Sequence, residues 1–453
     1  MSNDPVHWIA AIAAVVIWLI VCVSAAAISM RARRADRARL ASFKADIGAT
    51  VIAYASQTGF AEELAEMTAR ALTDAGEAAR VVSFADLDID MLASAKRALF
   101  VVSTTGEGDP PDSAGRVVRR MLDRDAALPD LSYGLLALGD RSYKDYCGFG
   151  HAVDGWLMRA GATPLFDVVE VDDADPEAIR HWQHQLNALT GSNAEPDWTP
   201  PSYDRWRLVE RRLLNPGSPG GEAFHLAFEP IGHTPDWFAG DIAEVGVPAS
   251  GGDRPAAREY SIASLPSEGR LELLIRLMQH PDGTPGLASG WLTRRAEVGD
   301  EIAMRVRVNR GFHGPEAATP LILIGNGTGL AGLRAHLKTR AVGNAGTWLM
   351  FGERTSAHDA FHDAELQAWL ASGALRRLDR TFSRDAGDGR YVQAVIAEQA
   401  EEVRAWVARG AAVYVCGSLE GMAEGVHAAL EEVLGADGLI ALAEAGRYRR
   451  DVY

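Results

Sequence analysis

Residues 258–264 (REYSIAS) place a cation, an aromatic ring and a hydroxyl close together in a stretch that reads as a β-strand. Side chains two positions apart on a strand lie on the same face. Arg258 and Tyr260 can therefore share a face on which a flat aromatic ligand lies while the guanidinium binds a phosphate. An ordinary half-buried strand is the alternative, so the neighbouring motifs must decide.

Three further segments have the composition of phosphate-binding turns, namely 56–61 (SQTGFA), 286–292 (GLASGWL) and 325–329 (GNGTG). Each opens a helical pattern, and the free amides and dipole of a helix N-terminus favour an anion. The first turn has no lysine of the Walker type, which argues against a nucleoside triphosphate with magnesium. Taken singly, each turn also fits a capped helix or a tight connection.

Two loops have the composition to clasp a planar ring. Residues 103–111 (STTGEGDPP) and 138–147 (LGDRSYKDYC) each follow a strand-like segment and supply small residues, and the second adds Tyr143. Ligands of doubly wound sheets bind at the carboxyl ends of strands, where both loops are expected. We expect Tyr143 to stack on the ring, with a surface tyrosine as the alternative.

Strand and helix patterns organise these motifs into three units. Residues 49–190 predict a doubly wound α/β unit with five strands, at 50–55, 79–83, 98–102, 134–138 and 165–169. A proline-containing linker at 191–205 precedes strand-like segments with turn signals, which predict a small antiparallel barrel at 206–315. A second strand and helix series predicts another α/β unit at 316–453.

Composition excludes several classes of function. The 453 residues are 47% hydrophobic and carry a formal net charge of −16, although the first 44 are basic. The strongly acidic remainder argues against nucleic acid and for a basic docking face on any protein partner. Cys22, Cys147 and Cys416 are far apart in sequence, so we expect a reducing compartment and no metal site.

The N-terminal residues predict a membrane anchor. From Trp8 to Met30 the sequence is apolar apart from two serines, and a basic run, RARRADRAR, follows. Such a stretch can span a bilayer, and the basic run favours the cytoplasmic side. We therefore expect residues 1–44 to comprise a single-pass transmembrane anchor and a basic juxtamembrane segment at the inner (cytoplasmic) membrane, with the catalytic units in the cytoplasm. A cleaved signal peptide would carry its positive charges before the apolar run.

In this order along one chain, the motifs resemble those of the diflavin reductases, which include the sulfite reductase flavoprotein and the NADPH-haemoprotein reductases. The resemblance implies a flavodoxin-like FMN domain, a FAD-binding barrel and an NADP domain of the ferredoxin-NADP reductase type. It assigns FMN binding to Ser56, Gln57, Thr58, Gly59, Ala61, Thr104, Thr105, Gly106, Gly108, Gly139, Asp140 and Tyr143. The helical insertion that many relatives carry in the barrel region is nearly absent here.

The resemblance also assigns residues of the second half. FAD binding falls to Arg258, Tyr260, Ser261, Gly286, Leu287, Ala288, Ser289 and Tyr453. Nucleotide binding falls to Gly325, Gly327, Thr328, Gly329, Arg354, Ser383, Arg384, Tyr391 and Gln393, the last four at the 2′-phosphate of NADP. Ser261, Cys416, Asp451 and Tyr453 are expected at the hydride-transfer site. A buried strand-end cysteine and a frayed terminus are the structural alternatives for Cys416 and Tyr453.

The expected function is that of a membrane-anchored reductase of the NADPH-haemoprotein reductase type, with a sulfite reductase flavoprotein as second choice. Electrons are expected to pass from NADPH to FAD, to FMN and to a haem or iron protein. One alternative is a reductase for a ferric-siderophore or quinone system of the membrane. Another is a flavin-binding interaction module without turnover, against which the intact Arg258, Ser261, Cys416 and Tyr453 argue.

Overall fold

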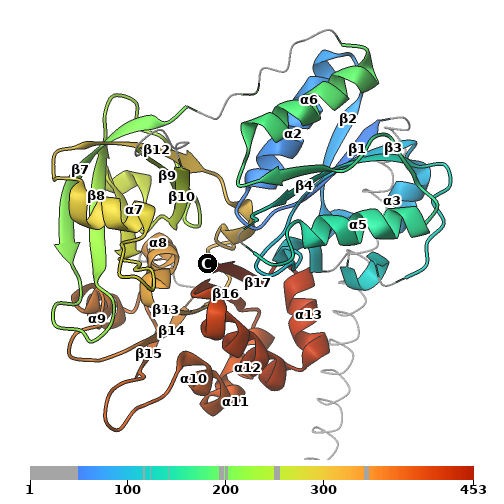
Figure 1. The fold of residues 1–453 in the computed structure, drawn as a ribbon. Coiled ribbons are helices and arrows are strands. Elements are labelled where there is room, and N and C mark those ends of the chain that lie inside the picture. The colour runs from blue at the N-terminus through green and yellow to red at the C-terminus, as the bar shows by residue number, and fades with distance from the viewer. Residues whose placement is uncertain are drawn as a thin grey trace, which may run out of the picture.

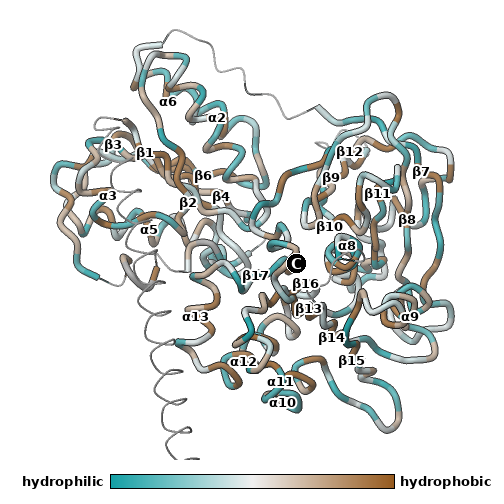
Figure 2. Tube along the Cα trace, turned by 180° about the vertical axis from the view of Figure 1, so that it is seen from behind, coloured by the Kyte–Doolittle hydropathy of each residue, from teal (hydrophilic) through white to brown (hydrophobic). Residues whose placement is uncertain are grey.

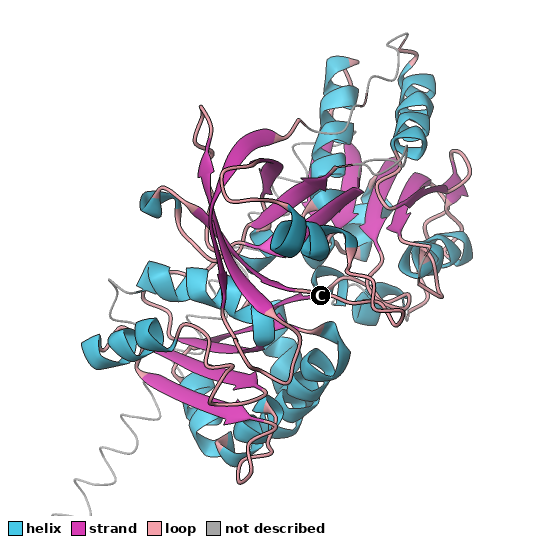
Figure 3. Cartoon of the chain, turned by 60° about the vertical axis from the view of Figure 1, so that its left-hand side comes forward, coloured by secondary structure: helices cyan, strands magenta, loops and turns pink. Residues whose placement is uncertain are grey.

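The computed structural model describes residues 49–453 apart from short gaps at 116–117, 123, 142, 193–197, 199–201, 249–255 and 341–345. Three sheets organise this part of the chain. Figure 1 shows three units built on them, arranged around the C-terminus. In Figure 3 the strands of the second sheet lie between the helices of the two α/β units.

The first sheet is parallel, with strand order β2-β1-β3-β4-β5 and β6 pairing with β4. Its strands are β1 (Thr50–Ala55), β2 (Ala79–Ser83), β3 (Arg97–Ser103), β4 (Ser132–Gly139), β5 (Thr163–Pro164) and β6 (Val169–Asp172). Helices α2 (Phe60–Asp74) and α6 (Pro176–Thr190) pack on one face, and α3 (Ile89–Ser94) and α5 (Gly148–Arg159) pack on the other. Because both faces are covered, the central strands are apolar runs, as the brown segments of Figure 2 show.

The strand expected at 165–169 is wrong. The chain pairs with β4 at β5 and β6 instead, and the residues between them leave the sheet. Phe166 packs edge-on against Trp182 of α6, with ring centroids 5.5 Å apart. The apolar run at 165–169 therefore serves packing beneath α6 before it becomes a strand.

The second sheet is antiparallel, with strand order β10-β9-β12-β7-β8-β11. Its strands are β7 (Asp204–Leu213), β8 (Ala223–Pro230), β9 (Ile242–Val247), β10 (Ala256–Ser261), β11 (Leu271–Arg276) and β12 (Glu301–Arg307). The end strands β10 and β11 touch, and the amide of Ala263 donates to the carbonyl of Glu272 at 2.8 Å. The sheet thus closes around an apolar core that includes Trp206 and Phe228, as expected of a small barrel. Among the described residues between β8 and β10, β9 is the only regular element.

The third sheet is parallel, with strand order β15-β14-β13-β16-β17. Its strands are β13 (Leu321–Asn326), β14 (Thr347–Glu353), β15 (Arg377–Phe382), β16 (Ala412–Gly417) and β17 (Tyr448–Val452). Helices α8 (Leu330–Arg340) and α9 (Asp363–Ser372) share the core of one face. The other face is covered by α10 (Val392–Glu398), α11 (Ala400–Ala408), α12 (Glu424–Leu434) and α13 (Ala436–Glu444).

Short helical segments join these elements. They are η1 (Phe84–Asp86), η2 (Asp112–Ala114), η3 (Val118–Leu122), η4 (Pro266–Glu268), α7 (Leu287–Gly290), η5 (Trp291–Arg295), η6 (Arg310–Phe312), η7 (Gly327–Gly329) and η8 (Leu419–Ala423).

The expectation of a transmembrane helix is corrected. Residues 1–44, on which it rested, lie outside the described residues. In the part of the chain that is described, no helix is long and apolar enough to cross a membrane. The longest, α2 and α6, have 15 residues each, which at about 1.5 Å per residue fall well short of a hydrocarbon core of about 30 Å. The transmembrane class and the inner-membrane localisation are withdrawn with it.

Candidate active site

The last strand of the third sheet brings three of the predicted residues together. Strands β16 and β17 are parallel and place Asp451 beside Cys416. The hydroxyl of Ser261, at the end of β10, donates to Oδ2 of Asp451 at 2.6 Å, and Sγ of Cys416 lies 3.7 Å from the same oxygen. All three side chains are buried. A barrel residue and two residues of the third unit thus form one polar cluster.

Burial controls the protonation of this cluster. Removal from water raises the pKa of Asp451 to about 6, and the charge of Glu259 adds to the rise while the hydrogen bonds from Ser261 and Cys416 oppose it. Burial and the Asp451 charge raise the pKa of the Cys416 thiol well above its usual value. The cluster therefore contains one carboxyl group that exchanges a proton near neutral pH beside a thiol that keeps its own.

The glycine turn at 325–329 packs directly on the end of β16. A Cβ atom at Gly325 or at Gly329 would lie 2.3 Å from the carbonyl oxygen of Cys416, which no side chain tolerates. The turn leads through η7 into α8, whose N-terminus lies at the carboxyl end of β13. This cradle fits a nucleotide pyrophosphate, because glycines permit close approach and the helix end favours an anion.

The C-terminal residue lies over the same turn. The hydroxyl of Tyr453 donates to Oγ1 of Thr328 at 3.3 Å, and its side chain is 56% exposed. The backbone of Tyr453 is held by Gly417 and Leu419, so the terminus is not frayed. The Tyr453 side chain is thus held at the glycine turn through Thr328.

The residues expected at the 2′-phosphate follow β15. The amides of Ser383 and Arg384 donate to the carbonyls of Glu353 and Arg354, which places them beside the end of β14. Tyr391 precedes α10 and is 55% exposed. Gln393 lies against Gly425 of α12, further from the surface. The structure thus gathers Ser383, Arg384 and Tyr391 at one edge of the sheet, while Gln393 packs inward.

A cavity of about 1050 Å³ lies between the first unit and the barrel. Seven of the residues assigned to FMN line it: Ser56, Thr58, Thr104, Gly106, Gly139, Asp140 and Tyr143. Oγ1 of Thr104 is buried without a partner among the described residues. A buried hydroxyl that faces a cavity fits a polar ligand, because such groups are normally hydrogen-bonded.

The other five residues assigned to FMN do not line the cavity. These are Gln57, Gly59, Ala61, Thr105 and Gly108. Gln57 instead points to the third unit, where Nε2 donates to the carbonyl of Arg450 at 3.1 Å. Thr105 closes its own loop by donating to the carbonyls of Asp109 and Pro110. Ala61 lies in α2 and is buried in the core of the first unit.

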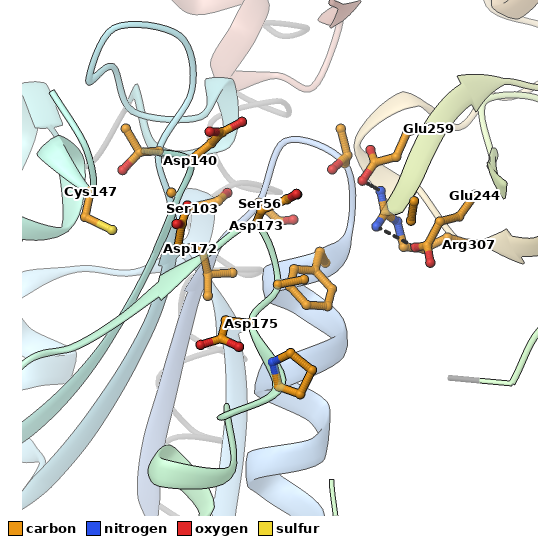
Figure 4. Close-up of a pocket in the computed structure, with 18 of the residues that line it drawn as sticks. Ser56, Ser103, Asp140, Cys147, Asp172, Asp173, Asp175, Glu244, Glu259 and Arg307 are labelled. Atoms are coloured by element: carbon orange, nitrogen blue, oxygen red, sulfur yellow. Dashed lines mark hydrogen bonds and ion pairs between the residues drawn. The ribbon is translucent and has the colours of Figure 1, made fainter. Parts of the chain in front are cut away.

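The cavity also has acidic residues that the sequence did not single out. Figure 4 shows Asp172, the last residue of β6, with Asp173 and Asp175 of the following loop on one side, and Glu244, Glu259 and Arg307 of the barrel on the other. Arg307 forms ion pairs with both barrel glutamates. The sequence did not single out these aspartates because it placed the last strand at 165–169. The structure has β6 at Val169–Asp172, so the loop at the carboxyl end of the strand lies further along the chain.

The barrel presents the residues assigned to FAD on two elements. Arg258 of β10 is exposed, while Tyr260 of the same strand packs partly against the barrel core. In the 286–292 segment, Oγ of Ser289 accepts from the amide of Met278 at 3.1 Å, and Leu287 is exposed while Ala288 is buried. The exposed cation beside a half-buried aromatic ring fits a ligand with a phosphate and a flat ring.

The first unit docks on both other units through charged residues. Arg450 of β17 pairs with Asp112, and Arg310 pairs with Glu62 of α2 at 2.5 Å. Arg305 of β12 pairs with Glu63 at 3.2 Å. The loops that line the cavity thus face the barrel and the C-terminal strand. These ion pairs hold the first unit against the other two.

Comparisons with known proteins agree with this architecture. Residues 52–182 match the Flavodoxin family and residues 323–428 match the Oxidoreductase NAD-binding domain. The chain is 28% identical to a sulfite reductase [NADPH] flavoprotein alpha-component of Vibrio vulnificus, covering 90% of this chain and 88% of that protein. It is 27% identical to that of Bacillus subtilis, covering 96% and 95%.

These matches bear on the length of the chain and on the cofactors. The alignment with the Vibrio vulnificus protein spans 542 positions, more than the 453 residues of this chain, so the relative contains segments that have no counterpart here. A flavodoxin domain joined to an oxidoreductase nucleotide domain, in a chain similar to NADPH flavoproteins over nearly its whole length, confirms the expected FMN, FAD and NADPH. With the Ser261, Cys416 and Asp451 cluster between its barrel and nucleotide units, the chain belongs to the diflavin reductase family.

Proposed function

We propose that this NADPH-dependent diflavin reductase passes electrons from NADPH to FAD, then to FMN, and finally to a haem or iron protein of the sulfite reductase type. The observation that carries the proposal is the meeting of the three units at the C-terminal strand. Asp451 of that strand binds Ser261 of the barrel, and the adjacent Arg450 binds Asp112 of the flavodoxin unit. One strand therefore holds the nucleotide, FAD and FMN sites together.

The chain's own residues have distinct roles in this scheme. Bound flavins supply the conversion of a two-electron hydride donor into single electrons. Tyr453 covers the glycine turn and must move aside when the nicotinamide ring enters. Ser261 and Cys416 hold the Asp451 carboxyl in place, and this carboxyl keeps or releases a proton near neutral pH.

The docking contacts suggest how the acceptor is reached. Glu62, Glu63 and Glu66 of α2 are paired with Arg305 and Arg310 in the docked arrangement. Release of the flavodoxin unit frees this acidic face for a partner with a basic docking face. Domain release then becomes a step that can limit turnover.

The alternatives are weaker. The hypothesis of a ferric-siderophore or quinone reductase depended on a membrane anchor that places FMN near the bilayer. No helix among the described residues supports such an anchor. A module without turnover has no need of a buried carboxyl at hydrogen-bonding distance from a serine of another unit.

The full chain tests the proposal. Heat release is expected to yield FMN and FAD, and NADPH is expected to reduce cytochrome c and ferricyanide. Mixing with a sulfite reductase haem component is expected to give NADPH-dependent reduction of its haem. Absence of FMN, or of NADPH-dependent reduction of either small acceptor, would overturn the diflavin assignment; failure with the haem component alone would overturn the acceptor.

A further inference from the structure

The loop after β15 carries equal numbers of positive and negative side chains where a 2′-phosphate is expected. Residues 383–390 (SRDAGDGR) contain two arginines and two aspartates. The loop folds as two successive turns, in which the amide of Asp385 donates to the carbonyl of Phe382 at 3.1 Å and the amide of Asp388 donates to that of Asp385 at 3.2 Å. The turns keep both aspartates in the same short loop as Arg384.

Backbone amides hold both carboxylates of this loop. The two carboxylate oxygens of Asp385 accept from the amide of Ser356, each at 3.2 Å. Oδ2 of Asp388 accepts from the amide of Phe382 at 2.6 Å. A backbone amide that donates to a carboxylate keeps the negative charge at a fixed place. The loop thus presents two fixed negative charges beside the carboxyl end of β15.

The second arginine of the loop is already paired with carboxylates. Nε of Arg390 donates to Oδ1 of Asp388 and Nη1 donates to Oε2 of Glu398, each at 2.6 Å. Glu398 is the last residue of α10, so the guanidinium is held between the loop and that helix. Arg384 is exposed, and within the described residues 381–391 it is the one cation that forms no ion pair.

The other residues assigned to the 2′-phosphate add no charge. The hydroxyl of Ser383 donates to the carbonyl of Glu353 at 3.3 Å, and Gln393 packs inward against Gly425. Tyr391 is exposed and offers a ring and a hydroxyl. One unpaired guanidinium is therefore available for a 2′-phosphate, in a loop that also carries two fixed carboxylates.

These charges change the balance between the two nicotinamide nucleotides. A 2′-phosphate is attracted by one arginine and repelled by the carboxylates of the same loop. The 2′-hydroxyl of NADH carries no charge, and a carboxylate can accept its hydrogen bond. A site built for a polar group rejects a ligand without that group by about 10⁴- to 10⁵-fold, whereas one charge-assisted hydrogen bond corresponds to about 10- to 100-fold. The loop therefore predicts weak discrimination.

We propose that NADH is a second hydride donor of this enzyme, and that the ion pairs of Arg390 with Asp388 and Glu398 keep the preference for NADPH at about 100-fold or less. NADH gives up the same hydride as NADPH and leaves as NAD⁺, so the reaction needs no further reactant. The inference rests on the proposed function, because it assigns a second substrate to the same nucleotide site.

Two measurements on the flavin-loaded full chain test the proposal. The first is kcat/KM for ferricyanide reduction with NADPH and with NADH. The second is calorimetric titration with NADP⁺ and with NAD⁺, which does not depend on turnover. A preference for the 2′-phosphorylated nucleotide of about 100-fold or less is expected in both, and a larger preference overturns the inference.

Variants separate the contributions of the two arginines. Arg384→Gln is expected to weaken NADP⁺ binding about 10- to 100-fold and to leave NAD⁺ binding unchanged. Asp388→Asn keeps an oxygen that can accept from the Phe382 amide, and Glu398→Gln leaves the loop sequence unaltered. Each loosens Arg390 by one pair and is expected to strengthen NADP⁺ binding about 2- to 5-fold, the effect of an exposed ion pair, with NAD⁺ binding unchanged. Glu401→Gln, at an exposed glutamate of α11, is the matched control and should change neither.

The Glu398 variant decides the part played by the ion pairs, because its position lies outside the loop and it serves even where Asp388→Asn disturbs the turns. Unchanged or weaker NADP⁺ binding in Glu398→Gln overturns the effect assigned to these pairs. If the unaltered chain oxidises and binds NADPH but not NADH, the inference fails while the proposed function stands. If it oxidises neither nucleotide, the proposed function fails and the inference falls with it.

Discussion

Oγ of Ser261 donates to Oδ2 of Asp451 over 2.6 Å, although 190 residues separate them in the chain. The bond joins the strand assigned to FAD with the last strand of the nucleotide sheet. It therefore exists only when the barrel and the nucleotide unit are packed together. Two consequences follow for Asp451, one for the reaction and one for stability.

Asp451→Asn is expected to slow flavin reduction by NADPH about 100-fold, because an amide keeps the hydrogen bond but cannot hold an exchangeable proton. In the unaltered chain the rate should follow a group with a pKa of about 6, and this dependence should vanish in the variant. Stopped-flow absorbance between pH 5 and 8 measures both. Asp437→Asn, an exposed position of α13, is the control and should leave the profile intact.

The same substitution should stabilise the fold at high pH. The folded-state pKa of Asp451, about 6, lies above its ordinary value of 3.8. The folded state therefore favours protonated Asp451. Below pH 3.8 the carboxyl does not reduce the free energy of unfolding, and between pH 3.8 and about 6 the reduction grows as pH rises. Above pH 6 the reduction is about 3 kcal/mol. The Tm of the variant relative to the unaltered chain should rise between pH 4 and 7, and a constant difference would contradict the assignment.

Charge reversal on the docking surface should open the molecule. Arg310→Glu loses the pairs with Glu62 and Glu66 and places a third carboxylate beside them. Exposed pairs contribute about 0.2–1 kcal/mol each, so the expected effect is a partial shift toward an extended form. Small-angle scattering should show a larger radius of gyration, and electron transfer to FMN should slow.

The Arg310→Glu experiment has a control variant and a second substitution that should restore docking. Arg205→Glu reverses a barrel charge that pairs with Glu301 and does not touch the flavodoxin unit, so it should change neither measurement. Combining Arg310→Glu with Glu66→Arg should restore part of the docking. High salt should mimic the opening in the unaltered chain, because it screens exposed charges.

How far the sequence predicts this molecule depends on whether the information is local. Strands such as β1 and β2 were placed correctly because apolar runs bounded by turns are local signals. Strand β17 (YRRDV) was not expected, since it is an edge strand with one buried residue, Asp451. The cluster of Ser261, Cys416 and Asp451 came from the family resemblance, and the structure supplies its geometry.

Other features could not be read from the sequence. Gln57 was assigned to the cofactor, yet its amide reaches Arg450, 393 residues away. Asp172 and Asp173, which line the cavity, were not predicted because the sequence placed the last strand at 165–169, whereas β6 ends at Asp172. Contacts between units arise from the meeting of surfaces, which no local pattern encodes.

Removal of the terminal ring should tighten nucleotide binding. Tyr453→Ala frees the turn at Thr328 without touching the buried cluster. A lost aromatic contact corresponds to about 0.5–1.5 kcal/mol, so NADP⁺ should bind about 2- to 10-fold more tightly, and reoxidation of the reduced enzyme should slow. Tyr391→Ala removes a tyrosine of similar exposure from the opposite end of the proposed nucleotide site, and it should weaken NADP⁺ binding. Equal effects of the two variants would contradict the assigned positions.

The glycine turn offers a stability test that is independent of the cofactors. A Cβ atom at Gly329 would lie 2.3 Å from the carbonyl oxygen of Cys416 and 2.5 Å from Cα of Gly417. Both neighbours are backbone atoms of β16, so Gly329→Ala must push the strand and the turn apart. Overpacking of this kind costs about 1–3 kcal/mol, and the Tm should fall by several degrees with loss of NADP⁺ binding. Gly438→Ala in α13 is the matched control, because its Cβ would meet only Cβ of Leu434 at an ordinary 3.7 Å. That variant should gain about 0.5–1 kcal/mol from helix propensity, so the two alanines are expected to move the Tm in opposite directions, and a shared direction would mean that the turn does not pack on β16 as described.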